Sequence, residues 1–232
     1  MTNLERLKSA VSRSDVARLL DFTPSGLSYV LYKAASTEKY HKFQIAKKAG
    51  GVRDICAPKG AMKFLQRNLA DVLYDCCDEL NKISARRPLS HGFRRNQSIF
   101  DNARQHKRRR FVLNVDLKDF FPTFNFGRVR GFFLKNRDFA LNESVSTILA
   151  QIACFEGSLP QGSPCSPVIS DMIAHILDVR LAQLSKLHRV TYSRYADDLT
   201  FSTNQKLSAG TGLLRRNTWV GMETGRGAGD RH

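Results

Sequence analysis

Hydrophobic residues recur at helical spacing over much of the chain. The longest such stretch covers residues 62–80, where apolar side chains return every three or four positions and predict an amphipathic helix that covers the core. The same spacing predicts further helices over residues 3–11, 14–20, 25–32, 127–136, 143–155 and 168–187.

The helices predicted at 14–20 and 25–32, with the turn between them, have the spacing of a helix-turn-helix. Helical hairpins that pack on a core show the same spacing, and we favour this second interpretation. A DNA-binding unit would instead require residues 14–32 to bind duplex DNA on their own.

Short strand-like runs lie between these helices. Residues 43–45 and 52–55 flank a basic, glycine-containing turn at 47–51, which predicts a hairpin. Residues 190–193 and 199–202 flank a second tight turn, the Tyr-Ala-Asp-Asp sequence at 195–198.

Two adjacent carboxylates, Asp197 and Asp198, lie at the second turn. Unit charges about 4 Å apart repel by about 4 kcal/mol at an effective dielectric of about 20, so a fold that holds both in a cleft needs a compensating cation. A divalent metal would supply that charge. An ordinary solvated turn is the alternative, because Asp is common in turns.

A third carboxylate, Asp116, ends the apolar run 111–115, which predicts a buried strand. If this strand and those beside the turn are neighbours in one antiparallel sheet, the three carboxylates converge on one edge. Such a set can hold two Mg²⁺ ions about 3.5–4 Å apart, the arrangement used for in-line displacement at phosphorus. One ion would activate the attacking hydroxyl, and the other would stabilise the triphosphate and the leaving pyrophosphate. For Asp116 alone, a capping or ion-pairing role is the alternative.

The charge of the chain favours a polyanionic partner. Its 232 residues carry a formal net charge of +16, and 42% of them are hydrophobic, which suffices for a core. Ten Lys or Arg residues against a single acid lie in the basic stripe, residues 82–110, which precedes the predicted strand at 111–115. A solvated face or a localisation tag is the alternative for the run 107–110, but the place of the stripe beside a strand suits phosphate contacts.

Other function classes are disfavoured by composition. No apolar stretch approaches the roughly 18 residues of a spanning helix, and the N-terminus lacks the apolar core of a signal peptide, so we expect a cytoplasmic protein without a membrane partner. The five cysteines form neither a CxxC pair nor a zinc-type set with histidine. We expect them to be small buried side chains.

Several segments together resemble reverse transcriptases. Residues 111–122 are similar to the first catalytic block of that family, residues 159–167 to its template-and-nucleotide loop, and residues 195–198 to its metal-binding turn, in matching order and spacing. Residues 90–99, with the Asn-Ala-x-x-His element at 102–106, narrow the resemblance to the retron-type enzymes of bacteria. The resemblance covers residues from about 40 to about 206.

The resemblance implies an α+β fold, the fingers and palm of a right-hand polymerase, with an antiparallel palm sheet packed on helices. We expect an N-terminal helical segment at 1–36, fingers with the basic stripe at 37–110, a palm with the catalytic carboxylates at 111–206, and a disordered or unrelated tail at 207–232. Only 34 residues follow Asp198, and those from 207 onward are glycine-rich without a helical or alternating pattern. We therefore expect the thumb to be missing from a truncated or frameshifted chain.

The resemblance also implies roles at the metal turn. Asp116 and Asp197 would be the principal ligands of two Mg²⁺ ions, or of Mn²⁺ in their place. Asp198 would support them, and the backbone carbonyl of Leu117 would be a further ligand.

Nucleotide contacts are implied in the same way. Lys47, Lys48 and Arg53 of the first hairpin would grip the triphosphate of the incoming dNTP. Gln161 would contact the nucleotide sugar or the template. Phe121 would exclude a 2′-hydroxyl and so select deoxynucleotides, although packing in the core is the alternative for this ring.

RNA contacts are expected from Arg94, Arg95, Asn102 and His106. The last two lie one helical turn apart on one face. Both side chains could therefore face one RNA groove, or they could tie their helix to the basic stripe.

Two functions of different classes remain open. The first is a retron-type RNA-directed DNA polymerase. By family analogy it copies part of its own structured RNA, which serves as template and primer, into branched msDNA. It would form an RNA–DNA duplex and serve in antiviral defence, with an unknown effector protein. The second is a catalytically impaired, thumbless remnant that binds RNA.

Overall fold

A computed structural model of the chain describes residues 1–47, 50–84 and 88–205. Contacts between Cα atoms divide the chain into two compact units: unit 1 comprises Met1–Arg86 and Phe121–Ile173, and unit 2 comprises Arg87–Phe120 and Ala174–His232. The tail expected at 207–232, and with it the expected absence of a thumb, lies outside the described residues. The expected domain boundaries stay a prediction.

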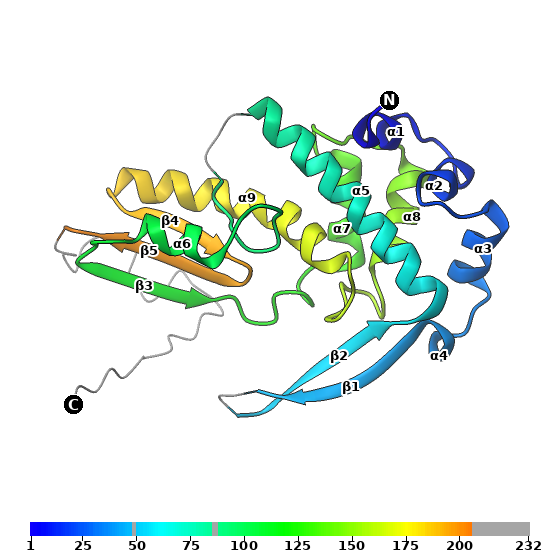
Figure 1. The fold of residues 1–232 in the computed structure, drawn as a ribbon, viewed down its shortest axis with the longest axis horizontal. Helices are drawn as coiled ribbons and strands as arrows, with labels where there is room; N and C mark the ends of the chain where they lie inside the picture. The colour runs from blue at the N-terminus through cyan, green and yellow to red at the C-terminus, as the bar shows by residue number, and fades with distance from the viewer. Residues whose placement is uncertain (48–49, 85–87, 206–232) are drawn as a thin grey trace. The chain divides into compact units, whose positions relative to one another are not determined.

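Helices dominate unit 1 (Figure 1). The expected helices are confirmed with ends shifted by up to two residues, except that the helix expected at 62–80 is longer, and a short additional helix, α4, precedes the first strand. The bounds are α1 (Asn3–Ser9), α2 (Arg13–Leu19), α3 (Pro24–Tyr32), α4 (Ser36–Lys39), α5 (Gly60–Ser84), α7 (Phe126–Lys135) and α8 (Glu143–Ala153).

The long helix α5 buries its apolar face in the core of unit 1, as its spacing predicts. Leu65, Leu69 and Leu73 are fully buried, as is Ile152 of α8. Helices α2 and α3 each bury part of their apolar residues, Val16, Ala17 and Leu19 in α2 and Leu27 and Val30 in α3. The Tyr32 hydroxyl donates a hydrogen bond to Gln151 of α8 over 2.9 Å. This geometry favours packing over a helix-turn-helix for residues 14–32.

The hairpin of unit 1 joins β1 (Tyr40–Ala46) and β2 (Val52–Pro58), which pair antiparallel (Figure 1). The predicted loop at 159–167 lies against it, because the Cys56 amide donates to the Gln161 carbonyl over 2.7 Å. Gly162 has a φ of +112°, and a Cβ there would lie 2.9 Å from Ile55 Cγ2. A glycine therefore suits the close approach of this loop to β2.

The sheet of unit 2 is antiparallel with the order β3-β5-β4 (Figure 1). Helix α9 packs on one face, where Leu177 and Leu181 meet Val115, Leu199 and Phe201. Because side chains alternate along a strand, Ser193 and Ser202 point to the other face, which carries α6. The bounds are α6 (Ile99–Gln105), β3 (Phe111–Asp116), α9 (Ser166–Leu187), β4 (Thr191–Tyr195) and β5 (Asp198–Thr203).

The expectation that β3 is a buried strand is wrong for most of its length. Val115 is buried, but Val112 is 53% exposed and Leu113 is 38% exposed. The cause is the strand order, because β3 lies at the edge of this three-stranded sheet and pairs with β5 only.

Two expectations from composition concern the rest of the chain. None of the five cysteines, all within the described residues, forms a disulfide bond; Cys76 and Cys165 are buried, and the other three are half-buried. Within the part of the chain that the structure describes, no helix is both long and apolar enough to cross a membrane.

Candidate polymerase metal site

The three predicted carboxylates lie at one end of the sheet of unit 2. Strands β3 and β5 run antiparallel with Asp116 directly opposite Asp198. The Leu117 amide donates to the Asp197 carbonyl over 3.0 Å, which extends the pairing one step into the turn. The condition set by the sequence, that these strands be neighbours in one antiparallel sheet, is therefore met.

The turn between β4 and β5 contains two central residues, Ala196 and Asp197, since Tyr195 pairs with Asp198. Ala196 has a φ of 57°, in the left-handed region, whereas Asp197 is not among the residues with positive φ. In two-residue hairpin loops, positive φ at the first position alone is typical of a type II′ turn, where glycine is preferred. Such backbone strain costs about 1–3 kcal/mol and persists only when the surroundings hold it.

Two contacts hold the turn. Arg194 Nη1 donates to the Ala196 carbonyl over 2.9 Å. On another side, a Cβ built on Gly92 would lie 2.2 Å from Ala196 N, so the two backbones touch. The segment around Gly92 is itself bound to β4, because the His91 amide donates to the Arg194 carbonyl and the Arg194 amide to the Leu89 carbonyl, each over 2.9 Å.

Sequence reasoning missed both Arg194 and Gly92 as residues of the site. A signal for Arg194 was present, because it follows Tyr192 by two positions on a strand and therefore points to the same face. A charge on the apolar face next to an acidic turn is unusual and needs a partner. For Gly92 the signal is its place in the family-like segment 90–99, which does not disclose the contact with the turn, since a close backbone approach between distant segments leaves no local pattern.

The electrostatics of the turn favour a bound cation. The pKa of Asp198 is raised, first by partial loss of solvent around its carboxyl and then by the neighbouring carboxylates of Asp197 and Asp116. Asp198 is exposed as a residue, and the two like charges beside it disfavour its ionised form. Hard carboxylate oxygens are the ligands that Mg²⁺ prefers. Among the described residues, however, no three His, Cys, Asp or Glu side chains are already gathered as a metal-binding group.

The candidate nucleotide-binding residues belong to unit 1. Lys47 and Arg53 are exposed on the hairpin of β1 and β2, whereas Gln161 and Phe121 are half-buried. The bond between the Gln161 carbonyl and Cys56 brings the loop and the hairpin together. Lys48 lies outside the described residues.

Two of the RNA-contact candidates are buried in unit 2. Ring nitrogens Nδ1 and Nε2 of His106 each lie 2.7 Å from a hydroxyl, that of Ser202 and of Ser193 respectively. The Ser193 hydroxyl also donates to Asn102 Oδ1 over 2.6 Å. Burial lowers the pKa of His106, with further contributions from Arg109 and His91, which favours the neutral ring.

These bonds favour the second interpretation of the Asn-Ala-x-x-His element, in which the helix is tied down, although to the sheet rather than to the basic stripe. The other two candidates are more accessible: Arg94 is half-buried and Arg95 is exposed.

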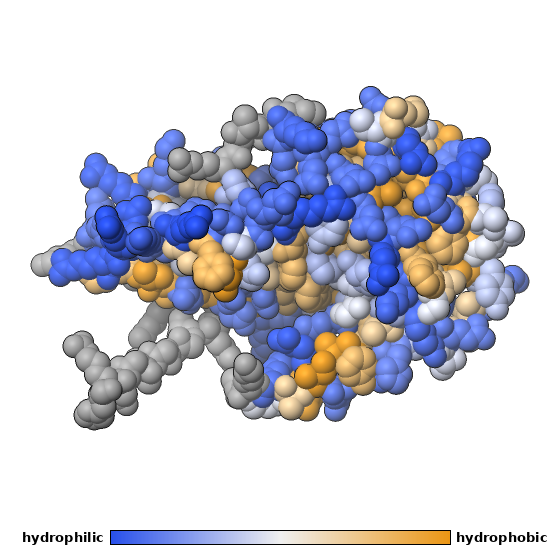
Figure 2. Space-filling view, viewed as in Figure 1, coloured by the Kyte–Doolittle hydropathy of each residue, from blue (hydrophilic) through white to orange (hydrophobic). Residues whose placement is uncertain are grey.

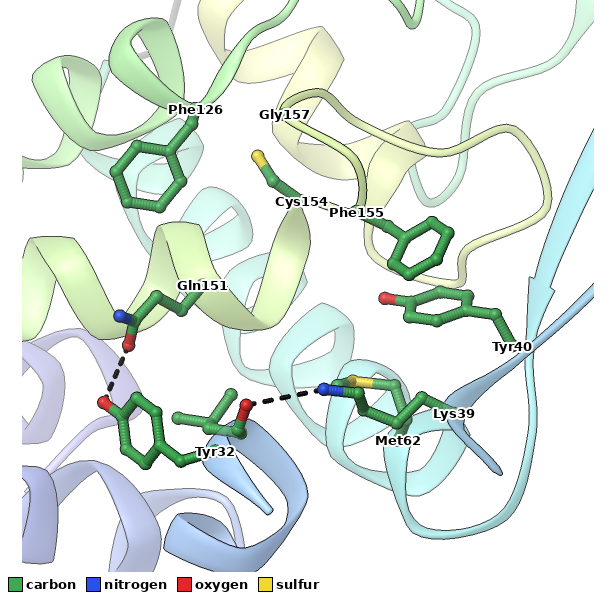
Figure 3. Close-up of a pocket in the computed structure, with 10 residues that line it drawn as sticks. Tyr32, Lys39, Tyr40, Met62, Phe126, Gln151, Cys154, Phe155 and Gly157 are labelled. Atoms are coloured by element: carbon green, nitrogen blue, oxygen red, sulfur yellow. Dashed lines mark hydrogen bonds between the residues drawn. The ribbon is translucent and has the colours of Figure 1, made fainter. Parts of the chain in front are cut away.

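A cavity in unit 1 contains none of the predicted site residues. Its volume is about 310 Å³, and Figure 3 shows its aromatic and thiol side chains around a central space. Tyr32 bonds to Gln151 along one wall, and Lys39 Nζ donates to the Leu31 carbonyl over 3.4 Å. With one cation and no carboxylate in its lining, the cavity lacks the groups of a polymerase metal site.

Comparisons with known proteins bear on the same segments. The family described as reverse transcriptase (RNA-dependent DNA polymerase) matches residues 45–220. The retron Ec86 reverse transcriptase of Escherichia coli is 34% identical over 190 residues, covering 81% of this chain and 56% of the relative. The retron Mx65 reverse transcriptase of Myxococcus xanthus is 37% identical over 178 residues, covering 70% and 40%. The chain thus spans about half the length of these relatives.

A solved structure gives a weaker likeness. The telomerase of Candida albicans, in complex with a fragment of telomeric RNA, matches with a TM-score of 0.49 and 12% identity, covering 72% of this chain and 38% of that one. This likeness is too weak to support a conclusion. The family match is different, because it covers most of the chain and includes all three carboxylates at one end of the sheet. The chain belongs to the reverse transcriptase family, and the relatives it resembles are of the retron type.

Proposed function

We propose that this chain supplies the catalytic palm and the fingers of a retron-type RNA-directed DNA polymerase. The observation that carries the proposal is the register of β3 and β5, which sets Asp116 opposite Asp198 beside the turn that bears Asp197. By analogy with the retron type, we further infer a structured RNA as template and primer, an RNA–DNA duplex as product, and a role in msDNA synthesis and antiviral defence.

Asp116 and Asp197 would be the principal ligands of the metal, with Asp198 and the Leu117 carbonyl as further oxygen donors. The carboxylates repel one another without a cation, so we expect their side chains to turn toward a shared one. Two bound Mg²⁺ ions, or Mn²⁺, would supply the charge that activates the primer hydroxyl and stabilises the leaving pyrophosphate. The protein's contribution is to fix the carboxylates on a rigid sheet edge.

The fingers hairpin and the loop that contacts it would bind the incoming dNTP. Lys47 and Arg53 are exposed cations on the hairpin. Cations that contact several phosphate oxygens stabilise the negative charge that develops on them during phosphoryl transfer. Lys48 stays in this proposal as a third cation. Gln161 would contact the sugar or the template.

Phe121→Ala is expected to raise ribonucleotide incorporation relative to deoxynucleotide incorporation by about tenfold or more, because a smaller side chain would no longer exclude the 2′-hydroxyl. Primer extension with dNTPs and NTPs in competition measures this ratio. Phe64→Ala on α5 is the matched control, since Phe64 is 61% exposed. Unchanged sugar selection in Phe121→Ala would leave Phe121 as a packing residue.

The exposed part of the basic stripe would bind RNA. Arg94 and Arg95 remain RNA-contact candidates. Asn102 and His106 are buried, so exposed residues on α6 and just after it replace them as candidates. Arg104, Lys107 and Arg108 are exposed cations, and Phe100 and Ile99 are 72% and 56% exposed. Figure 2 shows hydrophobic side chains among hydrophilic ones over this part of unit 2. Cations that track phosphates beside rings on which bases stack are typical of single-strand binding.

Replacing Arg104, Lys107 and Arg108 with Gln is expected to weaken RNA binding and to reduce the slope of log K against log salt by about two, because each lost phosphate contact removes about 0.7–0.9 from that slope. Fluorescence anisotropy with a labelled RNA at several salt concentrations measures it. The matched control replaces Lys8, Lys33 and Lys135, three exposed cations of unit 1, and keeps the net charge equal. An equal loss in both variants would show that only the overall charge matters.

Primer extension by the purified chain on an RNA template, with and without Mg²⁺, tests the proposed function. Incorporation of dNTPs that requires the metal supports the polymerase. RNA binding without incorporation would support the catalytically impaired, RNA-binding remnant instead.

A further inference from the structure

We propose that a buried network of Arg194, Asp178 and Tyr192 positions the catalytic turn, residues 195–198, so that its loss misplaces the carboxylates without removing them. The catalytic consequence rests on the proposed function. The structural part, that the network orders the turn, does not depend on it.

The network is sealed from solvent and fully bonded at its centre. The side chains of Arg194 and Asp178 are both 0% exposed. Arg194 Nε donates to Asp178 Oδ1 and Nη2 to Oδ2, each over 2.7 Å, so the guanidinium and the carboxylate form a bidentate salt bridge. The Tyr192 hydroxyl donates to Asp178 Oδ1 over 2.8 Å.

The same salt bridge directs a further donor of Arg194, Nη1, toward the turn. A guanidinium is planar and rigid, so fixing Nε and Nη2 on the carboxylate also fixes the direction of Nη1. Nη1 donates to the carbonyl of Ala196, the residue with φ of 57° at the first central position. A continuous chain of contacts thus runs from α9 through Asp178 and Arg194 to the strained residue beside Asp197.

Stability alone is a weak explanation for this arrangement. Burying two charges costs most of what their attraction returns, and apolar side chains of similar size often fill such a site equally well. Apolar side chains, however, could not donate a hydrogen bond to the Ala196 carbonyl, and so could not hold Ala196 in its left-handed conformation. Strained backbone at a site persists when its surroundings over-determine it, and Arg194 meets that need from the core side.

The test uses a double variant, Arg194→Met with Asp178→Asn, which removes both buried charges together and so leaves neither unpaired. Amide hydrogen exchange of residues 196–199 and 117 is measured in the metal-free full chain. We expect these amides to exchange about tenfold faster or more, because a turn without its anchor opens locally. Primer extension should show kcat reduced by about tenfold to 10²-fold with a much smaller change in KM, as expected for misplaced catalytic groups.

The matched control is Arg130→Met with Glu143→Gln, which removes the ion pair that joins α7 to α8. It should change neither the exchange of the turn nor kcat. Parent-like exchange of the turn in a folded Arg194→Met/Asp178→Asn variant would overturn the inference and leave the pair as core filling.

If the double variant does not fold, Arg194→Lys serves as the test. Lysine keeps the charge beside Asp178, but its single nitrogen cannot reproduce the planar guanidinium that bonds to both Asp178 oxygens and to the Ala196 carbonyl. Parent-like exchange in that variant would overturn the inference. A parent chain that does not extend primers would defeat the proposed function, while the exchange result would still decide whether the network orders the turn.

Discussion

Asp197→Asn is expected to abolish Mg²⁺-dependent dNTP incorporation, lowering kcat by about 10³-fold or more, the scale seen when a catalytic carboxylate is removed. Asn is nearly the same size as Asp and keeps one oxygen, so the turn should retain its shape. What is lost is a negative charge in the turn beside the pair formed by Asp116 and Asp198. Single-turnover primer extension on an RNA template measures the loss.

A second measurement on Asp197→Asn does not depend on catalysis. Because the carboxylates of Asp197, Asp198 and Asp116 repel, the metal-free variant should be slightly more stable than the parent. Mg²⁺ binds only the folded state, so it should raise the Tm of the parent in proportion to its binding and raise that of the variant much less. Thermal unfolding with and without Mg²⁺ reports both effects.

Asp138→Asn is the control, because Asp138 is a half-buried carboxylate of unit 1 outside the proposed site. It should retain the incorporation rate, RNA binding and metal-dependent Tm of the parent. Full incorporation by Asp197→Asn would show that this carboxylate is not a metal ligand, which would contradict the proposed polymerase site.

The parts of the fold that sequence predicts well are those with a local signal. The apolar spacing of α5 is repeated over many turns. At the start of α6, a Ser followed by an Asp three positions later is a local capping signal, and Ser98 accepts a hydrogen bond from the Asp101 amide. The convergence of the carboxylates was predictable for a different reason. Once β3 and β5 are taken as antiparallel neighbours, register alone sets Asp116 opposite Asp198.

The parts that sequence missed depend on which distant segments meet. Asn102 and His106 look like RNA contacts because they share a helix face, yet that face lies on Ser193 and Ser202 of the sheet. Val112 and Leu113 look buried because they are apolar, yet their strand lies at an edge. Only the three-dimensional pairing of strands decides such cases.

Gly92→Ala is expected to reduce kcat by about 10²-fold, the cost of misplacing reacting groups by about 1 Å. The added Cβ would lie 2.2 Å from Ala196 N and 3.0 Å from both Ala196 Cα and the Tyr195 carbonyl carbon. All three are backbone atoms, so no side-chain rotation relieves the clash. Backbone conformation is not the obstacle, since Gly92 is outside the range of positive φ that favours glycine.

The clash must move either the turn or the segment that carries Gly92. That segment is bound to β4 by two backbone hydrogen bonds, so a shift there would break pairing next to the turn. We therefore expect stability to fall by about 1–3 kcal/mol, the cost typical of overpacking, together with the loss of kcat. Urea unfolding and primer extension measure the two effects on the same preparation.

Gly131→Ala on α7 is the matched control, because a Cβ there meets nothing within 4 Å and alanine favours a helix by about 1 kcal/mol. It should leave kcat unchanged and stability equal or higher. Hydrogen exchange separates the two routes of damage in Gly92→Ala: faster exchange at 196–199 alone means that the turn has moved, whereas faster exchange of His91 and Arg194 means that the segment has detached. Parent-like kcat and stability would show that the turn and this segment separate without cost, so that the contact at Gly92 does not hold Asp197 and Asp198 in place.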